Sequence, residues 1–308
     1  MRILITGASG LLGLNLALEA AAEHEVYGTA KDHLLNTSAF TVLQSDLLSP
    51  GAVERVLDRT QPDWVIHCAA LANVDACESD PVLAQQTNSD LPARLAANVA
   101  RGGARLVHIS TDSVFDGSRG DYTEQDEPNP LGVYARTKLD GERRVAETNP
   151  EAIIARVNLF GWSMSGKRSL GEFFVRNLQA GVKVMGFTDV FFCPLLATDL
   201  AAILIKMLEL ELTGLYHVVS RECLSKHEFG IRVAHTFNLD ASLITPVSVE
   251  QSGLVATRSP NLTLRTDKLA HALGEQPPDV ADGLERFHRQ FMDGYPQHIQ
   301  RMAAQPPG

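Results

Sequence analysis

Cysteine is scarce in this chain. Its 308 residues include four cysteines, Cys68, Cys77, Cys193 and Cys223, whose spacing matches no metal-binding motif. The ten histidines also include no pair at ligand spacing in a plausible pocket. We therefore expect no metal site. We also expect all four cysteines to be free thiols, as in proteins of a reducing compartment.

The sequence also lacks an excess of positive charge and a long apolar run. Its formal net charge of −10 argues against nucleic acids and anionic membranes as partners, because an acidic surface attracts neither. The longest apolar run, LAAILIKMLEL, is interrupted by Lys206 and is too short to span a bilayer. A strand-like segment follows Arg2 at once, so we expect no signal peptide and a cytoplasmic protein.

Apolar, strand-like runs alternate with helical patterns through the first half of the chain. Strands are expected at residues 2–7, 24–30, 40–46, 62–70, 104–112 and 151–160. This alternation is typical of an α/β fold of the Rossmann type, with a doubly wound parallel sheet. We assign residues 1–160 to a dinucleotide-binding domain with contributions from later segments. Residues 161–302 mainly form a smaller, mixed α/β substrate-binding lobe, and residues 303–308 form a tail.

Three glycines lie between the first strand and the first helix. Gly7 permits a tight turn, Gly10 lets backbone N–H groups approach a pyrophosphate, and Gly13 lets the helix pack closely. Their position after the first strand of an alternating α/β pattern favours a dinucleotide site over a purely structural turn.

The residues after the next strands predict which dinucleotide binds. No carboxylate closes the second strand directly, and Lys31 lies where a 2′-phosphate would need a cation. This favours NADPH, although Asp32 follows at once and NADH stays open. Asp46 is a candidate acceptor for the adenine amino group or, alternatively, a helix cap. Ala69 and Ala70 would let a ribose lie against the backbone, or would simply pack in the core.

Tyr134 and Lys138 are four residues apart on an expected helix, which puts both side chains on one face. An ammonium near a phenol lowers the pKa of the phenol, so Tyr134 could act as proton donor to a carbonyl that receives hydride. Thr111 could hydrogen-bond the same carbonyl or cap the end of its strand, and the neighbouring Ser110 could take that part instead.

The G-x-x-G-x-x-G turn, HCAA, STD, NPLGVYARTKLDGE and ATDLA occur in the order seen in extended short-chain dehydrogenases/reductases. From Met1 to about Phe287, the chain resembles the dTDP-4-dehydrorhamnose reductase-like group. It also resembles the regulatory beta subunit of methionine adenosyltransferase. The resemblance implies that Thr111, Tyr134 and Lys138 are catalytic and that the second lobe binds a nucleotide-linked 4-keto-6-deoxysugar.

Several positions near the expected sugar depart from that group. Ser113 stands where those reductases have Tyr, and Leu159 stands where they have Trp. The segment FCPLLATDL keeps Pro194 of a Gly-x-Pro-Thr element but loses its Thr. Arg258 echoes an Arg-Pro element and could meet a phosphate, or could be an ordinary surface arginine. The substrate residues we expect are Ser113, Asn158, Leu159 and Arg258.

The sequence thus favours an NAD(P)H-dependent keto-sugar reductase with a small-molecule substrate. The alternatives are an NAD-dependent sugar epimerase and a non-catalytic, dinucleotide-binding regulatory subunit. A homodimer is the common habit of such folds. The expected cofactor contacts are Gly7, Gly10, Leu11, Leu12, Gly13, Lys31, Asp46, Leu47, Ala69, Ala70, Leu71, Tyr134 and Lys138.

Overall fold

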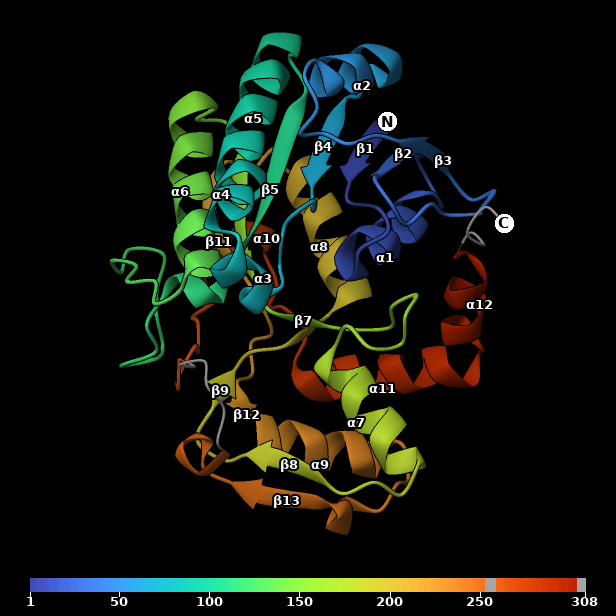
Figure 1. Cartoon of the computed structure of the whole chain (residues 1–308), viewed down its shortest axis with the longest axis vertical. Helices are drawn as coiled ribbons and strands as arrows, with labels where there is room; N and C mark the ends of the chain where they lie inside the picture. The colour runs from blue at the N-terminus through green and yellow to red at the C-terminus, as the bar shows by residue number, and fades with distance from the viewer. Residues whose placement is uncertain (253–258, 304–308) are drawn as a thin grey trace.

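A seven-stranded sheet organises the chain in the computed structural model, which describes residues 1–252 and 259–303 (Figure 1). Each adjacent pair of strands in this sheet is parallel. In spatial order the strands are β11 (Gly214–Val218), β6 (Ile153–Val157), β5 (Arg105–Thr111), β4 (Trp64–His67), β1 (Arg2–Thr6), β2 (Glu25–Ala30) and β3 (Thr41–Gln44). The structure confirms the expected doubly wound α/β fold.

Helices cover both faces of this sheet because its strands are apolar on both sides. One face packs against α2 (Ala52–Thr60), α5 (Leu91–Gly102) and α6 (Val133–Thr148) through Leu4, Val65 and Leu106. The other face packs against α1 (Leu11–Ala20) and α8 (Ala197–Glu209) through Ile3, Ile5 and Ile66. The short helices α3 (Val74–Ser79) and α4 (Pro81–Gln85) and a π-helical turn (Gln86–Asp90) lead into α5.

The second half of the chain builds a smaller group of elements beyond the carboxyl ends of the strands (Figure 1). Its short strand pairs are β7 (Leu159–Phe160) with β10 (Leu195–Leu196), β8 (Val184–Phe187) with β13 (Ile244–Val247), and β9 (Phe191–Phe192) with β12 (Leu224–Ser225). Its helices are α7 (Leu170–Gln179), α9 (Lys226–Thr236), α11 (Val280–Met292) and α12 (Tyr295–Arg301), whereas α10 (Asp267–Leu273) packs beside β11 of the main sheet. Short 3-10 turns occupy Asp112–Val114, Ala241–Leu243 and Val249–Ser252.

The two halves share one hydrophobic core. Phe160, Phe229 and Phe287 of the second half belong to the same buried cluster as Ile5 of β1. Strand β11 and helix α8 also join the main sheet from beyond residue 161. The boundary between residues 160 and 161 stays a prediction. In the part of the chain that the structure describes, no helix combines the length and the apolar character needed to cross a membrane.

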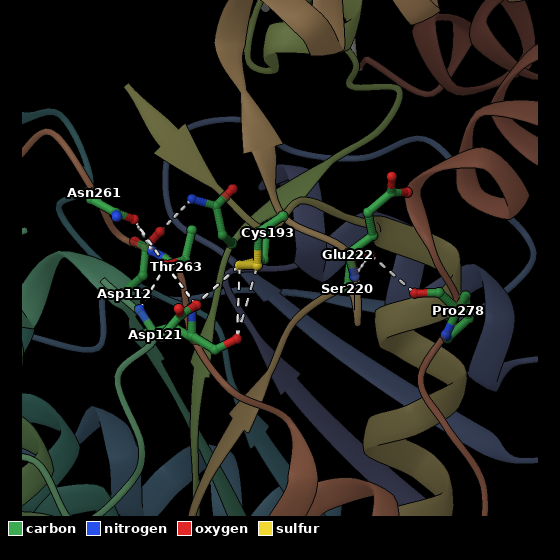
Figure 2. The surroundings of a disulfide bond; sticks show 11 residues. Asp112, Asp121, Cys193, Ser220, Glu222, Asn261, Thr263 and Pro278 are labelled. Atoms are coloured by element: carbon green, nitrogen blue, oxygen red, sulfur yellow. Dashed lines mark hydrogen bonds between the residues drawn. A yellow bond between two sulfur atoms is a disulfide. The ribbon is translucent and has the colours of Figure 1, made fainter. Parts of the chain in front are cut away.

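The expectation of four free thiols is wrong for two of the cysteines. Cys193 and Cys223 form a disulfide, whereas Cys68 and Cys77 are free (Figure 2). The antiparallel pairing of β9 with β12, in which Phe192 lies opposite Leu224, brings the two cysteines together. They are 30 residues apart in the sequence, so no local spacing could reveal the pair.

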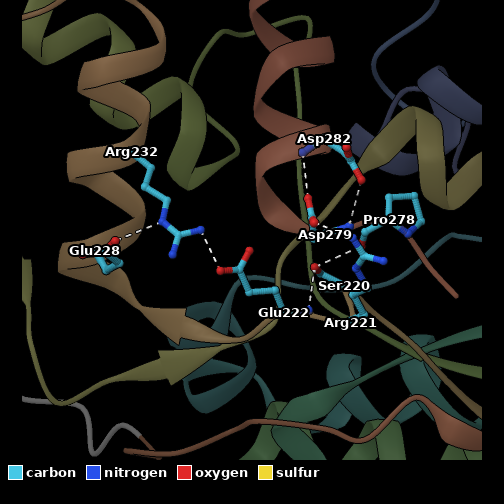
Figure 3. A network of polar contacts seen from close by, with 8 residues as sticks. All are labelled: Ser220, Arg221, Glu222, Glu228, Arg232, Pro278, Asp279 and Asp282. Atoms are coloured by element: carbon cyan, nitrogen blue, oxygen red, sulfur yellow. Dashed lines mark hydrogen bonds and ion pairs between the residues drawn. The ribbon is translucent and has the colours of Figure 1, made fainter.

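Ion pairs also hold the chain around the short strand β12 (Figure 3). Arg232 of α9 pairs with Glu222 at 2.7 Å and with Glu228 at 2.9 Å. Arg221 pairs with Asp279 at 2.5 Å, at the N-terminus of α11. The disulfide and these ion pairs therefore connect β9, α9 and α11 around one short strand, β12.

Thiol counting tests the disulfide. The unfolded protein should show two reactive thiols before reduction and four after it. Cys223→Ser should lower the free energy of unfolding by about 2–4 kcal/mol, because the bridge restricts the unfolded chain. Urea unfolding measures this loss. Cys68→Ser is the control, because it keeps the bridge and should still lose free energy of unfolding when the protein is reduced. Four reactive thiols before reduction would contradict the bridge.

Candidate active site

Two adjoining cavities open at the carboxyl ends of the strands, with volumes of about 790 and 410 Å³. The larger cavity is lined by Leu11, Leu12, Gly13, Thr111, Ser113, Tyr134, Lys138, Asn158 and Leu159. The smaller one is lined by Gly7, Lys31, Asp46, Leu47 and Ala69. Gly10, Ala70 and Leu71 line both. The structure thus brings together all the site residues expected from the sequence except Arg258, which lies outside the described residues. Their roles stay predictions.

The glycine turn has almost no room for side chains. Gly7 has a φ of +69°, and a Cβ there would lie 2.8 Å from the backbone of Ala69. A Cβ on Gly13 would lie 2.2 Å from the carbonyl oxygen of Gly7, a distance that no packed structure tolerates. Gly10 caps α1 in an extended conformation, and its N–H donates to the carbonyl oxygen of Gly7 at 2.9 Å. The turn therefore leaves its backbone open toward both cavities.

Two substitutions separate folding from binding at this turn. Gly10→Glu should keep the fold, because a Cβ there would meet only the oxygen of Gly7, at 3.1 Å. It should abolish dinucleotide binding by steric block and by repulsion of phosphate. Gly13→Ala should instead lower the melting temperature, because α1 must move away from Gly7. Thermal unfolding and dinucleotide titration of both variants measure this, and unchanged affinity in Gly10→Glu would refute the assignment.

Thr111, Tyr134 and Lys138 lie deep in the larger cavity, at the end of β5 and on the first turns of α6. The Lys138 ammonium donates to the carbonyl oxygen of Ile109 at 2.6 Å. Burial lowers the pKa of Lys138 to about 8, against the attraction of Glu142. Burial raises the pKa of Tyr134 to about 12, which a hydrogen bond with Thr111 partly opposes.

These pKa values correct one expectation. The sequence predicted that Lys138 would lower the pKa of Tyr134, yet the pKa of Tyr134 is raised. The reason is that the protein removes water from around the phenol, and this desolvation disfavours the phenolate. The Lys138 ammonium is also engaged by a backbone carbonyl.

The hydroxyl groups of Ser110 and Thr111 have different hydrogen-bond partners. The Ser110 hydroxyl donates to Glu142, which forms a buried ion pair with Arg156 at 2.8 Å. Ser110 also lines the larger cavity, but its hydroxyl hydrogen is directed to Glu142 and not into the cavity. The Thr111 hydroxyl accepts from the N–H of Ser113 at 3.2 Å, so Thr111 caps the end of its strand while its side chain also lines the cavity.

Lys31 and Asp46 form an ion pair at 3.0 Å in the smaller cavity. The hydrogen bond and charge of Asp46 raise the pKa of Lys31, so the ammonium stays charged. Asp46 also accepts from the N–H of Leu48 at 3.0 Å, which closes a local turn. A phosphate at Lys31 would thus share this cation with a carboxylate.

Sequence reasoning missed Asp112, which is the polar centre of the substrate side. Its carboxylate accepts from Asn158 at 2.5 Å, from Thr111 at 3.1 Å and from Ser113 at 3.2 Å. Burial raises its pKa, against these hydrogen bonds and the charge of Lys226. Its position directly after Thr111 was the available signal, but the contacts with Asn158 and Lys226 depend on the fold.

A third cavity of about 300 Å³ extends from this centre. Asp112, Ser113, Tyr134 and Asn158 line it together with the larger cavity. Its remaining wall includes the apolar side chains Val74, Leu131, Phe191 and Leu262. The arrangement offers polar groups at the reactive end and apolar surface around them, as expected for a small organic substrate.

Comparison with known proteins agrees with this geometry. The family model described as "RmlD substrate binding domain" matches residues 1–292. The chain belongs to this family. The dTDP-4-dehydrorhamnose reductase of Mycobacterium tuberculosis is 37% identical over 268 residues, covering 84% of this chain and 83% of that protein. Methionine adenosyltransferase 2 subunit beta of Danio rerio is 32% identical over 281 residues, covering 87% of this chain and 84% of that protein.

A solved structure extends the likeness to three dimensions. The dTDP-4-dehydrorhamnose reductase of Bacillus anthracis, in complex with NADP, superposes with a TM-score of 0.84 at 29% identity. The match covers 94% of this chain and 99% of that one. The resemblance noted from the sequence motifs is thereby confirmed for both named groups.

Proposed function

We propose that this protein is an NADPH-dependent reductase of a nucleotide-linked keto-sugar, of the 4-keto-6-deoxysugar type. The observation that carries the proposal is a cleft of two adjoining cavities, which meet at Gly10 and together are lined by the glycine turn and by Thr111, Tyr134 and Lys138. A dinucleotide and a carbonyl substrate could thus bind next to each other. The relatives named as dTDP-4-dehydrorhamnose reductases, one of them in complex with NADP, support the same activity.

The shape and charge of the cleft fit a dinucleotide. Gly7 and Gly13 leave no room for side chains, and Gly10 presents bare backbone at the N-terminus of α1, where phosphates bind favourably. Lys31 and Asp46 would lie at the adenosine end, and Tyr134 and Lys138 at the nicotinamide end. When bound, the nicotinamide supplies the hydride.

The residues of the chain supply the proton and the orientation. The raised pKa of Tyr134 keeps its phenol protonated at neutral pH, as an acid that donates a proton to a ketone oxygen requires. Thr111 presents a hydroxyl to the same oxygen. Lys138, with a pKa of about 8, keeps a largely positive charge one helical turn from Tyr134, which stabilises developing negative charge on the phenol oxygen.

Removing the phenol hydroxyl tests this mechanism. Tyr134→Phe should lower kcat by roughly 10²- to 10⁴-fold, the usual contribution of a positioned acid, with little change in NADPH affinity. NADPH oxidation is followed by absorbance with dTDP-4-dehydrorhamnose as substrate. Tyr27→Phe loses a hydroxyl on β2, away from the cleft, and should keep full activity. Undiminished turnover in Tyr134→Phe would refute Tyr134 as the acid.

Calorimetric titration with NADPH and NADH tests the cofactor. The wild type should bind NADPH more tightly, and Lys31→Ala should lose roughly 10-fold in NADPH affinity, with NADH affinity unchanged. Lys206→Ala is the control, because Lys206 is also an ion-paired surface lysine. Tight binding of NADH alone would favour an epimerase that retains its cofactor. Binding of neither would mean that the glycine turn is structural.

A second candidate follows from the likeness to methionine adenosyltransferase 2 subunit beta, which is a subunit by name. A regulatory subunit would bind dinucleotide without turnover of any keto-sugar and would associate with a partner enzyme. The presence of Thr111, Tyr134 and Lys138 together in one cavity favours catalysis over this candidate. The homodimer and the cytoplasmic location stay predictions.

A further inference from the structure

Arg168 lies where the two halves of the proposed cofactor cleft meet. Only five residues line both cavities among those that the structure describes, and they are Gly10, Cys68, Ala70, Leu71 and Arg168. Four of the five carry no charge at neutral pH, so Arg168 is the one cation at this junction. A dinucleotide that spans both cavities must have its two phosphates between them, beside Gly10.

The loop that carries Arg168 is held by a buried carboxylate. Glu172 of α7 accepts from the N–H of Ser163 at 2.6 Å, of Arg168 at 2.9 Å and of Ser169 at 3.1 Å. The Ser169 hydroxyl donates to the carbonyl oxygen of Gly161 at 2.7 Å, which closes the loop. The backbone of Arg168 is therefore fixed before any ligand binds.

The same loop is tied to the helix that follows the glycine turn. Asn15 of α1 donates to the carbonyl oxygen of Trp162 at 3.0 Å and to that of Leu11 at 2.7 Å. Tyr295 of α12 donates to the Asn15 side-chain oxygen at 2.9 Å. These bonds hold the Arg168 loop and the N-terminus of α1 at a fixed separation.

The guanidinium of Arg168 is available for a ligand. It makes no hydrogen bond or ion pair with the residues of the two described ranges, whereas Lys31 is paired with Asp46 and Lys138 with the carbonyl of Ile109. The α1 N-terminus offers only N–H groups to phosphate, and the chain as a whole is acidic. A pyrophosphate would therefore lack a full positive charge here without Arg168.

We propose that Arg168 binds the cofactor pyrophosphate together with the glycine turn, at the junction of the two cavities. Its planar fork can donate two parallel hydrogen bonds to phosphate oxygens, and it adds the full positive charge that backbone N–H groups do not carry. Because NADH and NADPH share the pyrophosphate, Arg168 contributes equally to both, in contrast to Lys31. The inference rests on the proposed function, since it requires that the cleft binds a nicotinamide dinucleotide.

The test compares Arg168→Gln with Lys167→Gln by calorimetric titration of the whole chain. Both variants lose one positive charge in the same loop, but Lys167 lines neither cavity. Arg168→Gln should weaken NADH and NADPH binding by a similar factor, roughly 10- to 100-fold, as expected for a charge-assisted hydrogen bond. Lys167→Gln should retain wild-type affinity. Binding to Arg168→Gln should also depend less on salt, because one phosphate contact is gone.

Each other outcome overturns the assignment. A loss confined to NADPH would assign Arg168 to the 2′-phosphate, and equal losses in both variants would indicate a general effect of charge. Unchanged affinity would show that Arg168 does not contribute to dinucleotide binding. The fold should survive the substitution because the guanidinium is exposed, and unchanged thermal unfolding verifies this. Failure of the wild type to bind either dinucleotide would instead refute the proposed function.

Discussion

The contact between Gly13 and the carbonyl of Gly7 is the constraint on which the cleft depends. Helix α1 follows β1 after a turn of residues 7–10, and it can approach the sheet edge only because Gly13 has no side chain. Gly7 in turn lies against the backbone of Ala69, which follows the neighbouring strand β4, and Gly10 lies between the two cavities. With a larger residue at position 13, α1 would have to move away from Gly7.

The order of the strands determines on which side of the glycine turn each group of site residues lies. β1 lies between β4 and β2, so the chain segments after these strands diverge to opposite sides of the glycine turn. Residues after β4, β5 and β6 gather around Tyr134, whereas Lys31 and Asp46 follow β2 and β3. A parallel sheet brings these strand ends to a single edge, and the reversal of strand order opens a crevice there. The division into a reactive half and an adenosine half is thus a consequence of topology.

The sequence predicts those features that depend on neighbours along the chain. The glycine spacing, the strand alternation and the i, i+4 relation of Tyr134 and Lys138 are local, and the structure preserves each of them. The Cys193–Cys223 bridge and the loop of Arg168 instead arise from segments that only the folded chain brings together. The pKa of Tyr134 was mispredicted for a related reason. The spacing of Tyr134 and Lys138 in the sequence shows that the two side chains are close, but it does not show how far the fold shields the phenol from water.

The charge of Lys138, which lies one helical turn from Tyr134, depends on the buried residues that surround it. Desolvation alone would drive Lys138 toward its neutral form, and Glu142, one turn further along α6, counteracts this with its negative charge. Glu142 is itself buried, and both Arg156 of β6 and Ser110 of β5 donate to its carboxylate. Arg156 of β6 thus holds the carboxylate whose charge favours the charged form of Lys138. The buried ion pair therefore influences the charge beside Tyr134, although neither of its members lines the two cavities.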